Sequence, residues 1–109
     1  MSISYDDFAK VEMTLGTILS VDVVEGADKL LRLMVDVGEA VPRQILSGIR
    51  TYFEDPSVLV GRQCPFVTNL APRTIRGLES NGMILAASTD DTLALLYPSE
   101  LLPPGTRLK

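Results

Sequence analysis

The sequence predicts an all-β domain, a five-stranded Greek-key barrel with short flanking helices. Apolar residues alternate with polar ones over residues 11–23 and again over residues 31–37, and a period of two is typical of half-buried strands. Clusters of Gly, Pro, Asp and Asn separate these runs from later apolar ones. Helix signals are confined to two short segments. Many short strands with little helix favour a small barrel in which the sheet closes on itself.

The N-terminal segment predicts a short helix followed by a long strand. Ser4 is a suitable N-cap for a helix that begins at Tyr5, because its hydroxyl can accept a hydrogen bond from the first turn. Phe8 would then face the core. The alternation over residues 11–23 follows, and Gly16 within it predicts the bend or bulge that a small closed barrel needs.

The middle of the chain predicts a hairpin, a third strand and a second short helix. A helix signal lies at residues 51–60, where Asp55 before Pro56 makes a good cap and first-turn pair. The preceding elements alternate regularly, as a turn at 25–29, a strand at 31–37, a turn at 38–42 and a strand at 43–49.

The C-terminal half completes the predicted barrel. Residues 63–70 form a further strand, in which Pro65 indicates an edge position or a bulge because proline lacks a backbone donor. A hairpin and an edge segment follow, at residues 83–87 with 93–97 and at residues 106–109 after the Pro103-Pro104-Gly105 turn. Among Greek-key barrels of this size, the OB-fold is the leading candidate.

The composition bounds the domain count and the location. The chain has 109 residues, enough for one domain spanning residues 1–109. No apolar stretch approaches the roughly 18 residues that a membrane span requires. The N-terminus lacks the basic and apolar regions of a signal peptide, so a cytoplasmic location with no membrane partner is expected.

The residue types that catalysis and metal binding most often need are scarce. Histidine is absent, and Cys64 is the only cysteine, in an apolar run that predicts burial. One cysteine cannot form an internal disulfide or an ordinary His/Cys zinc site, and without histidine there is no Ser-His-Asp or Cys-His set. The sequence therefore predicts no catalytic residue, no metal and no cofactor, and an enzyme is not expected.

Charge is distributed unevenly along the chain. The net charge of −4 argues against broad, nonspecific nucleic-acid binding. Residues 1–42 carry three basic and eight acidic side chains, and residues 77–109 carry two basic and four acidic ones. Residues 43–76 carry five arginines against two acidic residues, a net of +3. A polyanion could therefore bind locally, at the middle third of the chain.

Residues 69–88 form the stretch with the greatest density of turn residues and donors. Arg73 and Arg76 are bracketed by Pro72 and Gly77, which predicts a rigid, exposed corner. Guanidinium groups held in this way can make forked contacts with phosphate or stack on a base, although a solvated surface charge is the alternative for each. Other side chains could join them: Asn69 and Ser80 at a base edge or only as turn caps, and Lys29, Arg43 and Arg50 as further cations.

Ordered motifs along nearly the whole chain support a family resemblance. They are Asp7-Phe8, Val11-Glu12-Met13, Gly16-Thr17-Ile18, Ala27-Asp28-Lys29-Leu30, Val35-Asp36-Val37-Gly38, Pro42-Arg43-Gln44-Ile45, Ser47-Gly48-Ile49, Asn69-Leu70, Arg76-Gly77, Glu79-Ser80, Gly82-Met83-Ile84-Leu85-Ala86-Ala87 and Pro103-Pro104-Gly105. With these motifs the chain resembles the tRNA-binding domain family, which is found in methionyl-tRNA synthetases, as free-standing proteins and in a secretion-related chaperone.

The resemblance implies an OB-fold that binds tRNA by its overall shape, generally as a homodimer when the domain stands alone. The family's basic positions carry over onto Lys29, Arg43, Arg73 and Arg76, and its Ser-x-x-Met signature onto Ser80 and Met83. The expected function is therefore a tRNA-binding module, accessory to a methionyl-tRNA synthetase.

An export chaperone of the same fold, which binds protein instead of RNA, is the alternative function. The chain departs from the family pattern in its acidity, because threonine stands at several positions that are often lysine in relatives, namely Thr14, Thr17 and Thr74. An acidic surface weakens the expected attraction to RNA and leaves room for a protein partner.

Overall fold

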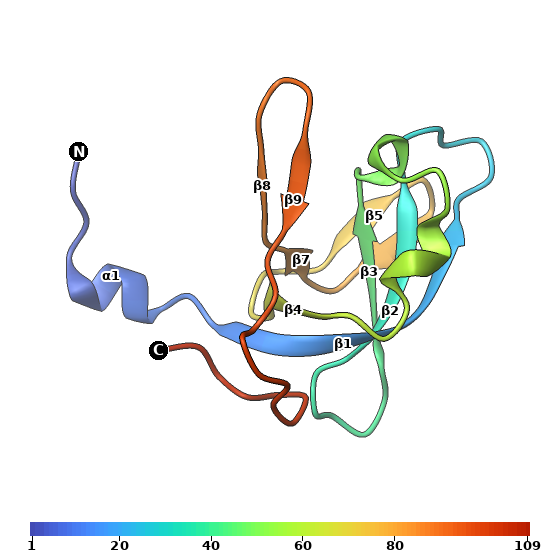
Figure 1. The fold of residues 1–109 in the computed structure, drawn as a ribbon. Coiled ribbons are helices and arrows are strands. Elements are labelled where there is room, and N and C mark those ends of the chain that lie inside the picture. The colour runs from blue at the N-terminus through green and yellow to red at the C-terminus, as the bar shows by residue number, and fades with distance from the viewer.

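The computed structural model describes residues 1–109 and contains a five-stranded antiparallel sheet that curls into a nearly closed barrel (Figure 1). The strand order is β3-β2-β1-β4-β7, and β3 and β7 lie against each other where the barrel closes. This arrangement confirms the predicted OB-fold. The barrel strands are β1 (Met13–Val23), β2 (Leu31–Asp36), β3 (Arg43–Ser47), β4 (Gln63–Val67) and β7 (Met83–Ile84).

Two hairpins extend the barrel. The first joins β5 (Arg73–Ile75) to β6 (Leu78–Ser80), and the second joins β8 (Ala86–Ser88) to β9 (Leu93–Leu95). Both are separate two-stranded sheets. The second hairpin, predicted from the apolar pattern, projects away from the barrel in Figure 1.

β1 organises the barrel because it pairs with three partners. Its C-terminal part pairs with β2, and its N-terminal part pairs with β4 on one edge and with the C-terminal tail on the other. Leu15 makes two of the tail bonds, donating to Thr106 O and accepting from Gly105 N, each at 2.8 Å. The predicted return of the tail to a barrel edge is confirmed.

A bulge in β1 changes which side chains face the core. The register with β2 shifts between Ile18 and Ser20, so the alternation predicted over residues 11–23 does not continue in one phase. Ile18 is fully buried, whereas Leu19 and Val23 are exposed. The extra residue of a bulge turns the following side chains to the opposite face.

Gly16 is not the site of this bulge, which corrects the expectation from the sequence. A Cβ at Gly16 would lie 2.6 Å from Val35 Cγ1 and 2.9 Å from Phe66 Cδ1. Val35 and Phe66 are fully buried members of the core, which also contains Leu31, Leu33 and Ile45. The glycine is therefore required by the close approach of β1 to the core side chains.

The helices are short, and their caps are better predicted than their packing. Ser4 Oγ accepts from Asp7 N at 3.1 Å at the start of α1 (Tyr5–Ala9), as predicted. Phe8 does not face the core: α1 stands off the barrel, and Phe8 is 41% exposed. No helix has the length and apolar character to cross a membrane.

The second helical region also differs in part from its prediction. Two 3₁₀ segments, η1 (Arg50–Tyr52) and η2 (Pro56–Leu59), occupy residues 50–59 instead of one α-helix. Asp55 caps η2 through a hydrogen bond from Ser57 N at 3.1 Å, as the sequence indicated. Segments this short rarely repay the cost of nucleating an α-helix.

Pro65 lies in a strand that has neighbours on both sides, because β1 and β7 flank β4. The ladder with β7 covers only Phe66 and Val67, however, so Pro65 lies at its end, which fits the predicted edge position. Leu15, the residue opposite Pro65, directs its own N–H and C=O groups to the C-terminal tail. The backbone of Pro65 therefore faces the β7 side, where its C=O accepts from Leu85 N. Its missing N–H lies beyond the end of the β4–β7 ladder, which explains why proline is accepted there.

Candidate nucleic-acid interface

Two loops flank the outer face of β2 and β3. The loop at residues 24–30 joins β1 to β2, and the segment at residues 68–82, which we call the hairpin loop, joins β4 to β7 and contains the β5–β6 hairpin. OB barrels bind oligonucleotides on this face and through these two loops. The basic corner predicted from the sequence lies in the second of these loops.

The β5–β6 hairpin is docked onto the neighbouring loop by apolar contacts. Ile75 and Leu78 pack against a small cluster formed by Val24, Ala27 and Leu46. These contacts involve the turn end of the hairpin, since Ile75 and Leu78 are the pair that flanks the turn. The hairpin is thus fixed at its tip as well as at its base.

Arg76 and Gly77 form the two-residue turn of this hairpin. Their φ angles are 53° and 78°, and two consecutive positive values define the type I′ turn that matches the twist of paired strands. Arg76 is the one non-glycine residue of the chain with positive φ. An L-residue in this region costs about 1–2 kcal/mol, so an arginine here is a strained choice that a binding role can explain.

Three of the predicted cations are exposed and have no acidic partner. They are Lys29 in the loop at residues 24–30, Arg73 on β5 and Arg76 at the turn. The ion pairs of the chain involve other cations, namely Lys10, Arg32, Arg43 and Arg107. The full charge of the three exposed side chains is available to an anionic ligand.

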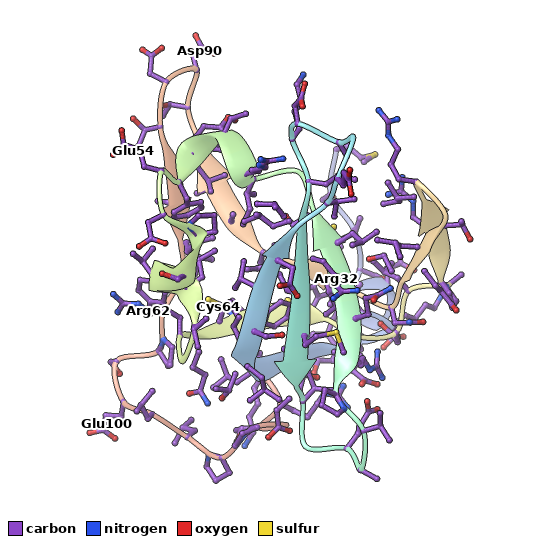
Figure 2. All side chains as sticks on the ribbon, turned by 90° about the vertical axis from the view of Figure 1, so that its right-hand side faces the viewer. Arg32, Glu54, Arg62, Cys64, Asp90 and Glu100 are labelled. Atoms are coloured by element: carbon purple, nitrogen blue, oxygen red, sulfur yellow. The ribbon has the colours of Figure 1, made fainter.

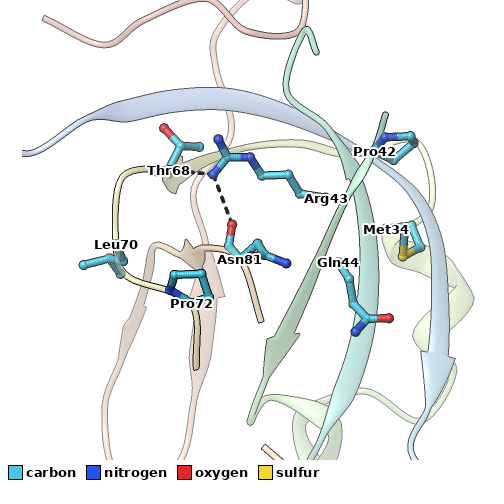
Figure 3. Close-up of a pocket in the computed structure, with 8 residues that line it drawn as sticks. All are labelled: Met34, Pro42, Arg43, Gln44, Thr68, Leu70, Pro72 and Asn81. Carbon is cyan, nitrogen blue, oxygen red and sulfur yellow. Dashed lines mark hydrogen bonds between the residues drawn. The ribbon is translucent and has the colours of Figure 1, made fainter. Parts of the chain in front are cut away.

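A groove of about 490 Å³ lies between β2–β3 and the hairpin loop (Figure 3). Its size is in the range of ligand pockets, although it is open to solvent and mostly polar. The side chains that line it come from β2, β3 and both ends of the loop: Met34, Pro42, Arg43, Gln44, Thr68, Leu70, Pro72 and Asn81.

Arg43, a predicted RNA contact, is committed to protein partners. Nε and Nη2 donate to the two carboxylate oxygens of Glu39 at 2.8 Å each, and Nη1 donates to the carbonyl oxygens of Thr68 and Asn81 (Figure 3). The Glu39 hydrogen bonds raise the pKa of Arg43, and the Arg43 hydrogen bonds lower the pKa of Glu39. The guanidinium therefore stays charged and paired at neutral pH.

Asn69 and Ser80 have structural partners. Asn69 Oδ1 accepts from Glu12 N at 2.8 Å, and Asn69 Nδ2 donates to Lys10 O at 2.7 Å, so this side chain ties the hairpin loop to the N-terminal segment. Ser80 is buried, and its hydroxyl accepts from Leu46 N at 3.0 Å on β3. The sequence left open whether these two side chains contact a base edge or only support the turn. In the structure, both support the local fold.

Met83 is 45% exposed. Its side chain has no charge and no hydrogen-bond donor to offer to RNA. It lines a small hollow together with Leu70, Arg73 and Ile75, next to the exposed face of β5. Its thioether could therefore lie against an apolar part of a ligand that Arg73 holds.

Several polar residues of this region carry no signal in the sequence alone. Glu39 is separated from Arg43 by a turn, and Thr68 becomes buried against Thr14 and Glu12 only when β4 and β1 pair. Gln44 lies within a motif of the resemblance, and it donates to Glu79 O at 2.9 Å on the hairpin loop. Tertiary pairing creates the contacts of Thr68 and Gln44, whereas Glu39 and Arg43 are only four residues apart in the sequence.

The remaining titratable groups show no arrangement suited to a metal. No three His, Cys, Asp or Glu side chains are grouped closely enough to hold an ion. Burial raises the pKa of the Cys64 thiol to about 11, so it stays protonated at neutral pH, and no disulfide is formed. The chemistry available at the β2–β3 face is charge attraction and hydrogen bonding.

Comparison with known proteins identifies relatives in two groups. Methionine–tRNA ligase of Xanthomonas campestris is 50% identical over 104 residues, which is 94% of this chain and 15% of the ligase. Methionine–tRNA ligase of Xylella fastidiosa is 48% identical over 105 residues, again 15% of its length. The chain thus matches only a small part of each ligase, and the ligase activity in these names belongs to the whole proteins. A tRNA-binding domain is non-catalytic by itself.

Solved structures agree on the fold over the whole chain. The MetRS-related protein from Pyrococcus horikoshii superposes with a TM-score of 0.91 at 33% identity, covering 100% of this chain and 99% of that one. The chaperone CsaA from Bacillus anthracis superposes with a TM-score of 0.88 at 25% identity and complete coverage of both chains. The sequence model described as "Putative tRNA binding domain" matches residues 13–107. The chain therefore belongs to the tRNA-binding domain family and is related to the domain of that kind in methionine–tRNA ligases.

Proposed function

We propose that the chain binds tRNA through the β5–β6 hairpin, with Arg73 and Arg76 on phosphates and Lys29 extending the cationic edge. The supporting observation is the pair of exposed, unpaired arginines on a hairpin that is fixed at both ends. A guanidinium on a fixed backbone gives up little entropy when it forms a forked contact with phosphate. Cytoplasmic tRNA is the expected ligand, and we expect the protein in that compartment.

Recognition by shape follows from the kind of side chains present. The hairpin loop contains no aromatic residue on which an unpaired base could stack. Charged contacts to the backbone of a folded RNA depend on where phosphates lie, and little on base identity. Ser80 and Met83 support this surface, the first by anchoring β6 to β3 and the second as an apolar contact beside Arg73.

The test is binding of unfractionated tRNA as a function of salt, by mobility shift. Arg73→Ala with Arg76→Ala should weaken binding and reduce the slope of log K against log salt by about 1.8, since each phosphate contact contributes about 0.9. Arg62→Ala with Lys109→Ala removes the same net charge from other places and should leave the slope near wild type. In Figure 2, Arg62 lies on the side of the β8–β9 hairpin. Equal slopes for the two double variants would refute the assignment.

We also propose that the domain serves a methionyl-tRNA synthetase by raising its affinity for tRNA. The identity to methionine–tRNA ligases over nearly the whole chain supports this partner. In a methionylation assay, addition of the wild-type domain to a synthetase should lower KM for tRNA without changing kcat. The Arg73→Ala, Arg76→Ala variant should not, and a fall in KM with this variant would argue for an effect that does not require RNA binding.

A homodimer is the expected assembly, with the N-terminal segment as its contact. All residues of α1 are exposed, including Tyr5 at 81% and Phe8 at 41%, and Ile3 before the helix is 61% exposed. A second copy of the chain would bury these side chains and cover the open end of β1. Apolar groups on a short helix that stands off the barrel otherwise remain in water at a cost of about 25 cal/mol per Å².

Sedimentation at micromolar concentration tests this assembly. Wild type should sediment as a dimer, and Tyr5→Asp with Phe8→Asp should give a folded monomer, because no residue of α1 is buried in the barrel core. A wild-type monomer would exclude the dimer, and a dimer that survives both substitutions would place the contact elsewhere.

A protein-binding chaperone is the second candidate function. It is favoured by the superposition on the chaperone CsaA and by the net charge of −4. This function predicts that the protein suppresses aggregation of an unfolded client and that excess tRNA does not compete. Competition by tRNA, or no suppression at all, would leave RNA binding as the function of this face.

A further inference from the structure

Arg43 reaches both ends of the hairpin loop from β3. Thr68 follows β4, Asn81 precedes β7, and the carbonyl oxygens of both accept from Nη1 of the same guanidinium, the second at 3.2 Å. No other side chain forms hydrogen bonds with both ends. We propose that Arg43 is a positioning residue that closes the base of the hairpin loop and so presents the β5–β6 hairpin to RNA, and that it does not contact phosphate itself. This inference rests on the proposed function.

The other hydrogen bonds of the loop divide into two sets that Arg43 joins. Asn81 N donates to Gln44 O, and Ser80 accepts from Leu46 N, so the C-terminal end of the loop is tied to β3. The N-terminal end is tied instead to the residue that precedes β1, since Thr68 N and Thr68 Oγ1 both donate to Glu12. Arg43 thus adds a side-chain connection between the two attachments, beside the Val67–Met83 pair that joins β4 to β7 at the base of the loop.

Glu39 holds the guanidinium in this position and cancels its charge. The carboxylate accepts from Nε and Nη2, the forked arrangement that is strongest between arginine and a carboxylate. The Arg43 side chain is only 23% exposed, whereas Arg73 and Arg76 are exposed and unpaired. A phosphate at Arg43 would have to compete with Glu39 for the guanidinium, and it would meet the carboxylate's negative charge.

The positioning and contact roles of Arg43 predict opposite effects of Glu39→Gln. If Arg43 contacted phosphate, loss of the competing carboxylate would free the guanidinium and tighten tRNA binding. If Arg43 positions the loop, loss of one strong acceptor lets the guanidinium move and weakens tRNA binding. Arg43→Lys adds a second comparison, because an ammonium keeps the charge but cannot hold one carboxylate and two carbonyls in a planar fork.

The experiment combines tRNA binding against salt with hydrogen exchange of the free protein. Glu39→Gln and Arg43→Lys should each weaken binding about threefold to tenfold, the range expected when a contact surface must be ordered on binding. Both should keep the wild-type salt slope and speed exchange at residues 68–82 while leaving exchange of β1 and β2 unchanged. Arg73→Ala is the reference contact variant, with a slope reduced by about 0.9 and unchanged exchange.

Two results would overturn the positioning role. One is tighter tRNA binding by Glu39→Gln, and the other is wild-type exchange of residues 68–82 in Arg43→Lys. If wild type did not bind tRNA, the proposed function would fail, while the exchange data would still decide whether Arg43 holds the loop. Protection of β1 and β2 reports that each variant is folded, so a loss of binding through general unfolding is recognised.

Discussion

The β5–β6 and β8–β9 hairpins leave the same barrel but differ in support and charge. β5–β6 ends in the tight Arg76–Gly77 turn, and its apolar pair Ile75 and Leu78 docks on the loop at residues 24–30. Its base is tied to β3 through Ser80. Its exposed side chains include two arginines without acidic partners.

β8–β9 has a wider turn and carries the opposite charge. Thr89 N donates to Thr92 O at 2.8 Å, and Thr92 N donates to Thr89 Oγ1 at 3.2 Å. The residues between them are Asp90 and Asp91, and Figure 2 shows Asp90 at the tip, on the side of the molecule away from β5–β6. Leu95 at the base of this hairpin and Leu93 beside its turn both pack against the barrel core.

The comparison shows how an acidic chain can bind a polyanion. The net charge of −4 is an average over faces of opposite sign, and a ligand responds to the local field within a Debye length of about 8 Å. Under the proposed function, the anionic hairpin would repel RNA from one side while the cationic one would receive it on the other. This uneven charge distribution would set the orientation of the bound ligand as well as its affinity.

Reversal of the cationic hairpin should have the largest effect. Arg73→Glu with Arg76→Glu replaces two attractive contacts by repulsion, so tRNA affinity should fall by about 100-fold or more. Asp90→Asn with Asp91→Asn also changes two charges but on the other hairpin, and affinity should stay within about threefold of wild type. Mobility shift at fixed salt measures both. Similar changes in the two variants would mean that net charge, and not the β5–β6 hairpin, governs binding.

Damage to the barrel should affect both hairpins alike. A methyl group at Gly16 would press on Val35 and Phe66, neither of which can move toward solvent, so Gly16→Ala should lower the free energy of unfolding by about 1–3 kcal/mol. Gly48→Ala is the matched control, because the nearest atom to its new methyl group is 4.0 Å away. Urea denaturation measures the loss. An unchanged midpoint for Gly16→Ala would mean that the core is looser than the structure shows.

The sequence was sufficient for the fold because alternation and turn residues act locally. The succession of strands and turns along the chain, the helix caps at Ser4 and Asp55 and the turn before the returning tail all follow from short-range patterns. The errors arise where tertiary contacts decide. The bulge after Ile18 shifts the burial phase, and Gly16 is explained by core side chains that are distant in sequence.

Relief of the backbone strain at Arg76 should have a smaller effect, which the turn of the other hairpin should not show. Asparagine adopts positive φ at a lower energy cost than arginine does. Arg76→Asn should therefore stabilise the protein by about 0.5–1 kcal/mol while weakening tRNA binding. Asp91→Asn is again the control, since Asp91 has no positive φ and should show almost no change in stability. Thermal unfolding measures the gain. A destabilised Arg76→Asn would show that the arginine makes contacts that outweigh its backbone strain.

The candidate site was only partly predictable. Arg73 and Arg76 stood out because Pro72 and Gly77 bracket them, and the structure leaves both exposed. Arg43 and Ser80 carried the same family signal, yet their partners are Glu39, Leu46 N and loop carbonyls. A sequence shows which side chains can donate hydrogen bonds, but not which of them are already bonded within the fold. That information comes only from the contacts between β3 and the hairpin loop.

The smallest expected effect is a pH dependence confined to one hairpin. Hydrogen bonds from Arg43 lower the pKa of Glu39 below its ordinary 4.5, so the ion pair contributes fully above about pH 4.5. Its contribution is lost as pH falls through the lowered pKa, because protonation removes the charge that holds the guanidinium. Glu39 is 47% exposed, and solvent screening keeps the effect on global stability small.

Hydrogen exchange, corrected for the intrinsic pH dependence of the amide reaction, should reveal this effect. Between pH 5.5 and pH 3, protection at residues 68–82 should fall in wild type, and protection at residues 86–95 should not. Glu39→Gln should show low protection at residues 68–82 at both pH values, because it lacks the titrating group. Equal pH responses of the two hairpins would mean that acid loosens the barrel as a whole. The independence of the cationic hairpin, on which the contrast with β8–β9 depends, would then be lost.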